Sequence, residues 1–342
     1  MTIKQIYNLA IQMGIAADPR QRRGIEKWLV RTKKQYQKLS KDARALYDRE
    51  RLTNPYADTR ILFGDPNARV KTILAGIDIN SGDIALAIAM QDRSYEVKKV
   101  MKYKTNNIIA SSLHNSLLPK IDLIINHHPQ GKALAALDEV MHLQADLMAA
   151  QGVPINVAEG VMKARIEQVS RSVAPANHYE TVDAAKLAKI PFMCAHTVCD
   201  NNVYNFLTKW LERKNFETVG ELVEALKKIP EYKIAAQNNA GPRIFAGSPE
   251  NRTGKIVALE ITGGTEGSKE VYEKLAQAGV GTIIGMHMKD ENREEALKYH
   301  INVVVAGHIS SDSIGMNLFL DRLAAKNTKI IPISGLIRVR RK

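Results

Sequence analysis

Apolar residues recur along the chain with two different periods, one before residue 53 and another after residue 70. Between residues 3 and 50 they return every three or four positions, which predicts two or three amphipathic helices. After residue 70, short runs rich in β-branched residues alternate with helical patterns, which predicts buried strands separated by helices. We therefore expect an α/β protein with largely parallel strands and a helical N-terminal extension.

The same pattern predicts how the chain is organised. Residues 1–53 form the expected basic helical extension, and residues 54–342 form the expected core. Residues 76–80 and 258–262 resemble each other, because each segment places an acidic residue near a strand end, before a turn, a helix and a strand that ends in histidine. We therefore expect two related lobes that face each other. The predicted strands lie at residues 70–79, 121–126, 154–158, 191–197, 255–262, 281–288, 301–308 and 329–337.

Histidines and aspartates gather at the carboxyl ends of these predicted strands. Open α/β sheets bind their ligands at this edge. Neutral imidazoles and carboxylates together suit divalent ions such as zinc, manganese, iron or cobalt. The sequence therefore predicts a metal site from residues at four strand ends, which are His127 with His128, His196 with Asp200, His287, and His308 with Asp312.

A structural role is the alternative for several of these side chains. Asp200 and Asp312 each precede a predicted helix, beginning at Asn201 and Ser313, so each aspartate is also a candidate N-cap. Capping and metal binding are compatible. The pair of histidines at 127 and 128 directly follows a buried apolar run and precedes a proline, which favours a functional role over a surface position.

Charge is unevenly distributed along the 342 residues, which are 45% hydrophobic and 25% charged and carry a net charge of +13. Residues 20–52 hold twelve Lys and Arg against four Asp and Glu, a net of +8. Such a segment can attract nucleic acid through counterion release. We favour a solvated helical face instead, because few aromatic residues accompany the charges. No apolar run approaches the ~20 residues of a membrane span, so we expect a soluble, cytoplasmic protein.

Three segments resemble the motifs of a known family. Residues 126–129 (NHHP), 195–200 (AHTVCD) and 307–312 (GHISSD) are similar to the three ordered motifs of the Nif-three-like proteins. These are hexameric proteins with a dinuclear metal centre, often called GTP cyclohydrolase 1 type 2. The resemblance extends over residues 54–342, and it implies that a pair of metal ions is held by five residues, His127, His128, Asp200, His308 and Asp312.

The chain departs from the family pattern at several positions. The third motif usually ends in a glutamate that bridges the metals, whereas this chain has Asp312, which is shorter by one methylene. Bridging by Asp312 therefore requires a closer approach of the backbone, which the small residues Ser310, Ser311 and Gly315 would permit. Residues 198 and 199 are Val-Cys in place of the usual Asn-Leu, and we recognise no counterpart of the first 50 residues in the family pattern.

The resemblance also implies a function. It suggests two divalent ions per chain, a homohexamer, and metal-dependent hydrolysis of a nucleotide or a related small molecule. His287 is a candidate acid–base or substrate-contacting residue, with a packed structural histidine as the alternative. A second hypothesis is a non-enzymatic metal- or nucleotide-binding assembly in which the basic extension is a docking arm. The sequence leaves the native metal and the substrate open.

Overall fold

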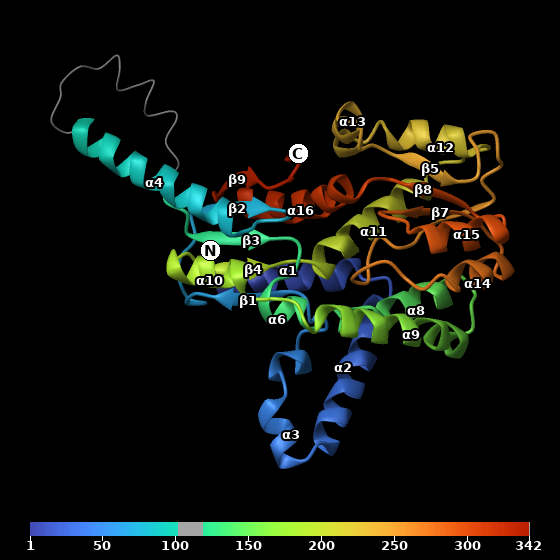
Figure 1. Ribbon diagram of the computed structural model, residues 1–342, viewed down its shortest axis with the longest axis horizontal. Coiled ribbons are helices and arrows are strands. Elements are labelled where there is room, and N and C mark those ends of the chain that lie inside the picture. The colour runs from blue at the N-terminus through green and yellow to red at the C-terminus, as the bar shows by residue number, and fades with distance from the viewer. Residues whose placement is uncertain (102–118, 342) are drawn as a thin grey trace.

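Two separate β-sheets form the framework of the chain in the computed structural model, which describes residues 1–101 and 119–341 (Figure 1). The first sheet has the strand order β1-β4-β3-β2-β9 and the second has the order β5-β8-β7-β6. The strands are β1 (Arg60–Phe63), β2 (Thr72–Gly76), β3 (Leu123–Asn126), β4 (Phe192–Cys194), β5 (Arg243–Ala246), β6 (Lys255–Ala258), β7 (Val280–Gly285), β8 (Asn302–Val305) and β9 (Lys329–Ile333).

The two sheets share one plan. In each, three neighbouring strands pair in parallel, β2-β3-β4 in the first and β6-β7-β8 in the second. One antiparallel strand then closes the same side of each sheet, β1 beside β4 and β5 beside β8. Strand β9 adds a further parallel strand to the first sheet only. The prediction of an α/β fold with two related lobes is therefore confirmed.

Two helices, α11 (Thr197–Leu211) and α16 (His308–Ala324), lie between the sheets (Figure 1). Each contributes side chains to the apolar cores of both lobes. From α11, Val198 packs in the core of the first sheet and Val203 in that of the second. From α16, Phe319 packs in the first core and Ile314 in the second. Because both cores hold the same two helices, the lobes are joined by buried apolar contacts.

The helices α11 and α16 approach each other so closely that only a glycine fits at the crossing. A Cβ atom placed on Gly315 would lie 2.3 Å from the carbonyl oxygen of Cys199 and 2.8 Å from a methyl carbon of Val203. Next to this point, the Cys199 Sγ and Met316 Sδ atoms are 3.6 Å apart. The crossing brings the first turns of the two helices together.

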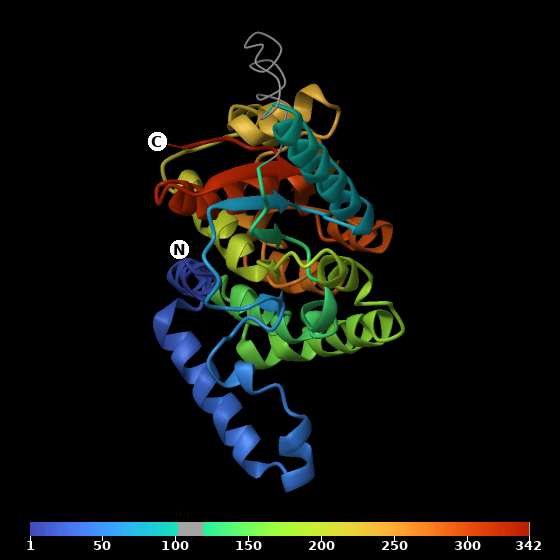
Figure 2. The ribbon, with the colours of Figure 1, turned by 90° about the vertical axis from the view of Figure 1, so that its left-hand side faces the viewer.

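The N-terminal helices divide into a packed part and a projecting part. Helix α1 (Ile3–Ala17) packs on α11, and Ile3 and Ile6 lie in the core of the first lobe. Helices α2 (Gln21–Lys38) and α3 (Lys41–Leu46) project from the body as a hairpin (Figure 2). Most side chains of α2 face solvent, as the basic pattern predicted. The domain boundary at residue 53 stays a prediction.

The remaining helices cover the sheets, and one of them corrects a predicted element. Residues 154–158 were expected to form a strand, but this is wrong, because helix α9 begins at Ile155, directly after Pro154. A proline readily precedes the first turn of a helix, so the short apolar run was misleading. None of the described helices is both long and apolar enough to span a bilayer. The bounds are η1 (Arg49–Leu52), α4 (Ser81–Met101), α6 (Gly131–Leu134), α7 (Leu137–Val140), α8 (His142–Ala150), α9 (Ile155–Val173), α10 (Glu180–Leu187), α12 (Val219–Leu226), α13 (Pro230–Gln237), α14 (Val271–Gln277) and α15 (Asp290–Lys298).

The crossing of α11 and α16 generates a stability prediction. Gly315→Ala places a methyl group against backbone that has no room to move, so we expect a loss of about 1–3 kcal/mol in the free energy of unfolding. Gly160→Ala is the matched control, because Gly160 lies inside α9 with no atom near its missing Cβ. The control should be neutral or slightly stabilising. Urea unfolding of both variants measures the difference, and equal midpoints would contradict the tight crossing.

Candidate metal centre

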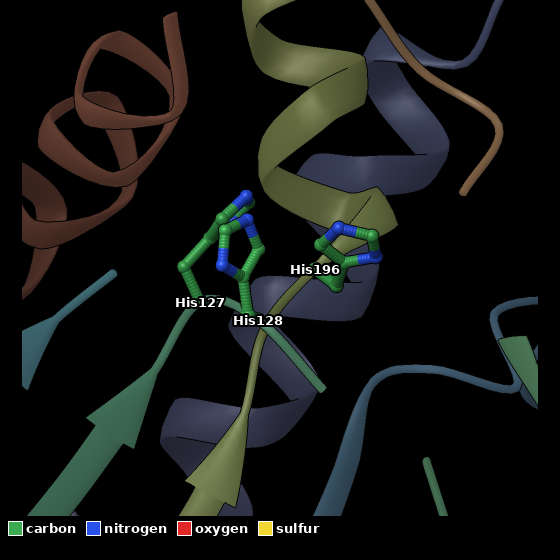
Figure 3. Close-up of side chains that lie close together, drawn as sticks. All are labelled: His127, His128 and His196. Carbon is green, nitrogen blue, oxygen red and sulfur yellow. The ribbon is translucent and has the colours of Figure 1, made fainter. Parts of the chain in front are cut away.

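Three histidines lie close together where strands of the first sheet end (Figure 3). His127 and His128 directly follow β3, and His196 lies between β4 and α11. The ring centroids of His127 and His196 are 4.9 Å apart, and those of His127 and His128 are 5.2 Å apart. Parallel strands present their carboxyl-terminal residues at one edge of the sheet. Imidazoles from distant parts of the sequence therefore share one small volume.

Two aspartates and a fourth histidine come from the first turns of α11 and α16. We expected these helices to begin just after the aspartates, but this is wrong, because α11 begins at Thr197 and α16 at His308. Asp200 and Asp312 consequently lie inside the helices and cap neither of them. Since His308 and Asp312 are four residues apart in α16, their side chains lie on the same face of that helix.

The carboxylate of Asp312 lies between two sets of side chains. Its Oδ1 atom is 3.5 Å from Nε2 of His127, which in turn is 3.3 Å from Oδ1 of Asp200. Its Oδ2 atom is 3.4 Å from Nε2 of His128 and 3.5 Å from Nε2 of His308. Each set, with Asp312 included, offers three ligand atoms within 4.8 Å of one another. The five predicted side chains thus form two groups that share one carboxylate.

The central atoms of these groups are buried and lack hydrogen-bond partners among the described residues. They are Nε2 of His127, Oδ1 of Asp200 and both carboxylate oxygens of Asp312. Leaving buried polar atoms unpaired is costly, and a carboxylate costs most. Ligand atoms around a tetrahedral ion at ~2.0–2.2 Å are about 3.4 Å apart, close to the separations seen here. A divalent ion in each group would therefore satisfy atoms that the protein leaves open.

Further carboxylates turn the histidine rings toward the centre. The Nδ1–H of His128 donates to Oδ1 of Asp78 at 2.5 Å, and that of His196 donates to Oδ2 of Asp58 at 2.7 Å. The Nδ1–H of His127 donates a hydrogen bond to the backbone carbonyl oxygen of Ala195 at 3.1 Å. In each case the other ring nitrogen, Nε2, faces the shared volume. Metal-binding histidines are typically held by such hydrogen bonds, which fix the tautomer and the ring orientation.

Sequence reasoning missed part of this arrangement. It noted His196 but left it outside the ligand set, whereas His127, His128 and His196 form a further group that could hold an ion. It gave no role to the aspartates that orient the rings. Asp78 had a signal, because it is the acidic residue near the end of a buried strand. Asp58 precedes β1 in an irregular segment and had no comparable signal.

Electrostatics within the group favours an ionised carboxylate beside charged imidazoles when no metal is bound. Burial would raise the pKa of Asp312, but the neighbouring imidazoles, above all that of His127, hold this pKa well below its usual range. Burial would lower the pKa of His128, but the adjacent carboxylates of Asp312 and Asp78 outweigh burial and raise this pKa to about 9. The pKa of His127 is raised in the same way. A metal ion would therefore have to replace protons.

His287 lies beside these groups but not within them. It follows β7 in the second lobe, and its ring meets that of His308 edge-on, with 5.3 Å between the centroids. Both residues line one small cavity together with Asp200, Glu260 and Asp312. Burial lowers the pKa of His287 to about 4, so its imidazole is neutral near pH 7. The position is compatible with contact to a molecule bound in the cavity.

These protonation states generate a prediction about pH. Because a proton on His128 competes with the metal below a pKa of about 9, apparent metal affinity should rise between pH 6 and 8 instead of levelling off near 6.5. The slope should be about tenfold per pH unit for each proton displaced. Titration calorimetry with Mn²⁺ in buffers of different ionisation enthalpy counts the protons released. Asp78→Asn weakens the hydrogen bond to His128 and should lower the pH at which the metal affinity stops rising. A metal affinity that does not depend on pH would contradict the protonation state given for His128.

Comparisons with known proteins support the fold. No family model matches the chain, and no curated protein matches it either. Among solved structures, a NIF3 superfamily protein from Sphaerobacter thermophilus matches with a TM-score of 0.69 and 22% identity, over 98% of this chain and 99% of that one. Reduced HcgD from Methanocaldococcus jannaschii matches with a TM-score of 0.46 and 14% identity, over 85% and 94% of the two chains. The match to the Sphaerobacter thermophilus protein shows that this chain shares the fold of a NIF3 superfamily protein, as the three motifs predicted.

Proposed function

We propose that the chain binds two divalent metal ions that share the carboxylate of Asp312. His127 and Asp200 complete one set of ligands, and His128 and His308 complete the other. The observation that supports this proposal best is the position of Asp312, whose two buried oxygens face different histidines and have no hydrogen-bond partner among the described residues. Zinc, manganese, iron and cobalt all suit such imidazole and carboxylate ligands.

The position of α16 supports bridging by the shorter aspartate. Glycine at position 315 lets the helix approach α11 closely, and Asp312 lies one turn before it. A backbone that lies close to the metal site is what a bridging side chain shorter by one methylene requires. The alternative is that Asp312 binds one ion only and that a water molecule bridges the pair.

We propose metal-dependent hydrolysis as the activity, with a nucleotide or a related small molecule as the substrate. A pair of ions would supply an activated water and stabilise an oxyanion or a phosphate. The chain's own contribution is to hold the imidazoles with Asp58 and Asp78 and to keep the site largely buried. His287 is placed to contact the substrate or to move a proton, since its neutral ring lines the same cavity. The GTP cyclohydrolase-like assignment rests on the family resemblance.

A non-enzymatic assembly is the second candidate, and the projecting hairpin of α2 and α3 favours it (Figure 2). The hairpin carries most of the basic residues in the segment 20–52, so it is suited to an acidic partner or to nucleic acid. Under this hypothesis the metal pair stabilises a homohexamer, and the hairpin is its docking arm. We still favour the hydrolase, because a structural role would not require the metal ligands to line a cavity.

The proposed ligands generate a prediction about stoichiometry. Asp312→Asn removes the charge with little change of volume, so it should lower the binding affinity for both ions by at least tenfold. Asp200→Ala should lose at least one of the ions without unfolding the protein. Asp183→Asn, an exposed aspartate of α10 paired with Lys186, is the matched control and should bind as the wild type does. Elemental analysis and calorimetry with Mn²⁺ give the result. Loss of one ion alone in Asp312→Asn would indicate a terminal ligand, and unchanged binding would remove Asp312 from the site.

Catalysis separates the two candidate functions. The metal-loaded protein should hydrolyse at least one member of a panel of purine nucleotides and related small molecules, and a chelator should abolish that turnover. Asp312→Asn should lower kcat by about a hundredfold or more, because the activated water would lose its metal. A panel with no turnover by a fully loaded protein, together with intact assembly, would favour the non-enzymatic role.

A further inference from the structure

A second cluster of acidic and imidazole side chains lies in the second lobe, outside the proposed pair of ions. Glu260 follows β6, Glu266 lies in the loop that leads to α14, and His287 follows β7. One ligand atom from each of the three residues lies within 4.8 Å of the others. We call these three residues the Glu260 cluster. None of them is among the proposed ligands of the pair.

Glu260 has no hydrogen-bond partner within the described part of the chain. Its side chain is buried, with the residue 8% exposed, and neither Oε1 nor Oε2 has a donor. Nδ1 of His287 is also buried and unpaired. A buried carboxylate without donors is one of the most costly arrangements in a protein. Such a group is a candidate ligand for a cation.

The basic groups nearby do not fill this role. The backbone N–H of Lys289 donates to Oε1 of Glu266 at 2.6 Å, and its Nζ atom is 3.5 Å from Oε2 of the same residue. The guanidinium of Arg165 donates from Nε to the backbone oxygen of Glu266 at 2.9 Å. Both cations thus interact with Glu266, and Glu260 still lacks a donor.

In the first lobe, the residues equivalent to Glu260 and His287 form a hydrogen bond with each other. Asp78 and His128 occupy the equivalent places after β2 and β3, and there the carboxylate accepts a hydrogen bond from the ring at 2.5 Å. Glu260 and His287 follow β6 and β7, yet neither is the other's hydrogen-bond partner. The second lobe instead adds the further carboxylate of Glu266. The hydrogen-bonded pair of Asp78 and His128 in the first lobe therefore corresponds to the Glu260 cluster in the second lobe, where Glu260 and His287 are not hydrogen-bonded to each other.

We propose that Glu260, Glu266 and His287 bind a third divalent cation. One imidazole and two carboxylates suit zinc, manganese, iron or cobalt. Nδ1 of His287 and both oxygens of Glu260 are buried without partners among the described residues, so they are available to a cation. Burial and the charge of Glu266 raise the pKa of Glu260 to about 8, so a bound cation would displace the proton of Glu260 near pH 7.

The third cation would share a cavity with the proposed pair. Glu260 and His287 line the cavity from the second lobe, while Asp200, His308 and Asp312 line it from the two central helices. The proposed third ion and the proposed pair would therefore border the same cavity. The site itself does not depend on the pair, because it uses none of the pair's ligands.

Metal counting with Mn²⁺ tests the proposal. Protein stripped with a chelator is reloaded with MnCl₂, freed of excess metal, and analysed by mass spectrometry and calorimetry. Glu260→Gln keeps the volume of the side chain, and His287→Gln removes the ring. Each variant should bind one Mn²⁺ fewer than the wild type under the same conditions. Glu291→Gln, an exposed acid at the start of the neighbouring helix α15, is the control and should bind as many ions as the wild type.

The outcomes separate this site from the pair. If Asp312→Asn loses the pair while retaining one ion, and adding Glu260→Gln removes that ion as well, the third site is established. If Asp312→Asn changes nothing and Glu260→Gln still loses one ion, the third site stands and the proposed pair fails. Two folded variants, Glu260→Gln and His287→Gln, that both bind as much Mn²⁺ as the wild type would overturn the third site. Circular dichroism of the metal-free proteins establishes that the variants are folded.

Discussion

The close crossing of α11 and α16 is the contact on which the rest of the site depends. Both helices lie between the two sheets and supply side chains to both cores, so their positions are set by packing on two sides. At Gly315 the backbones approach without an intervening side chain. This approach places Asp312 beside His127 and His128, which follow β3. A site made by residues from both lobes is therefore held together mainly by apolar burial.

The electrostatics of the site follow from that burial. Unpaired carboxylates are costly when they are buried, and the chain places several of them around one cavity. Asp58 and Asp78 accept hydrogen bonds from the Nδ1–H groups of His196 and His128, so the Nε2 atoms of these two rings stay available to a metal ion. Asp312 and Glu260 have no such partner among the described residues. These unpaired carboxyl groups line the cavity, where cations are able to bind them.

Much of the arrangement could be predicted from the sequence. Alternating apolar runs predicted the α/β fold, and the paired segments at 76–80 and 258–262 predicted two related lobes. The three motifs predicted which five side chains meet. The starts of α11 and α16 were misjudged, because Asp200 and Asp312 look like N-caps when only the local sequence is read. The positions of Asp58 and Glu266 were not predictable, since both residues lie in irregular segments that are placed by tertiary packing.

X-ray diffraction from crystals of the Mn²⁺-loaded protein, with data that record the metal's anomalous signal, tests the central claim most directly. At Asp312 we predict two anomalous peaks roughly 3.5–4 Å apart, as in other two-metal sites, in addition to the separate peak expected at the Glu260 cluster. Each of the two peaks at Asp312 should lie within about 2.2 Å of a different oxygen of that residue. A single peak at this position, or a pair of peaks with neither in contact with Asp312, would contradict a carboxylate-bridged pair.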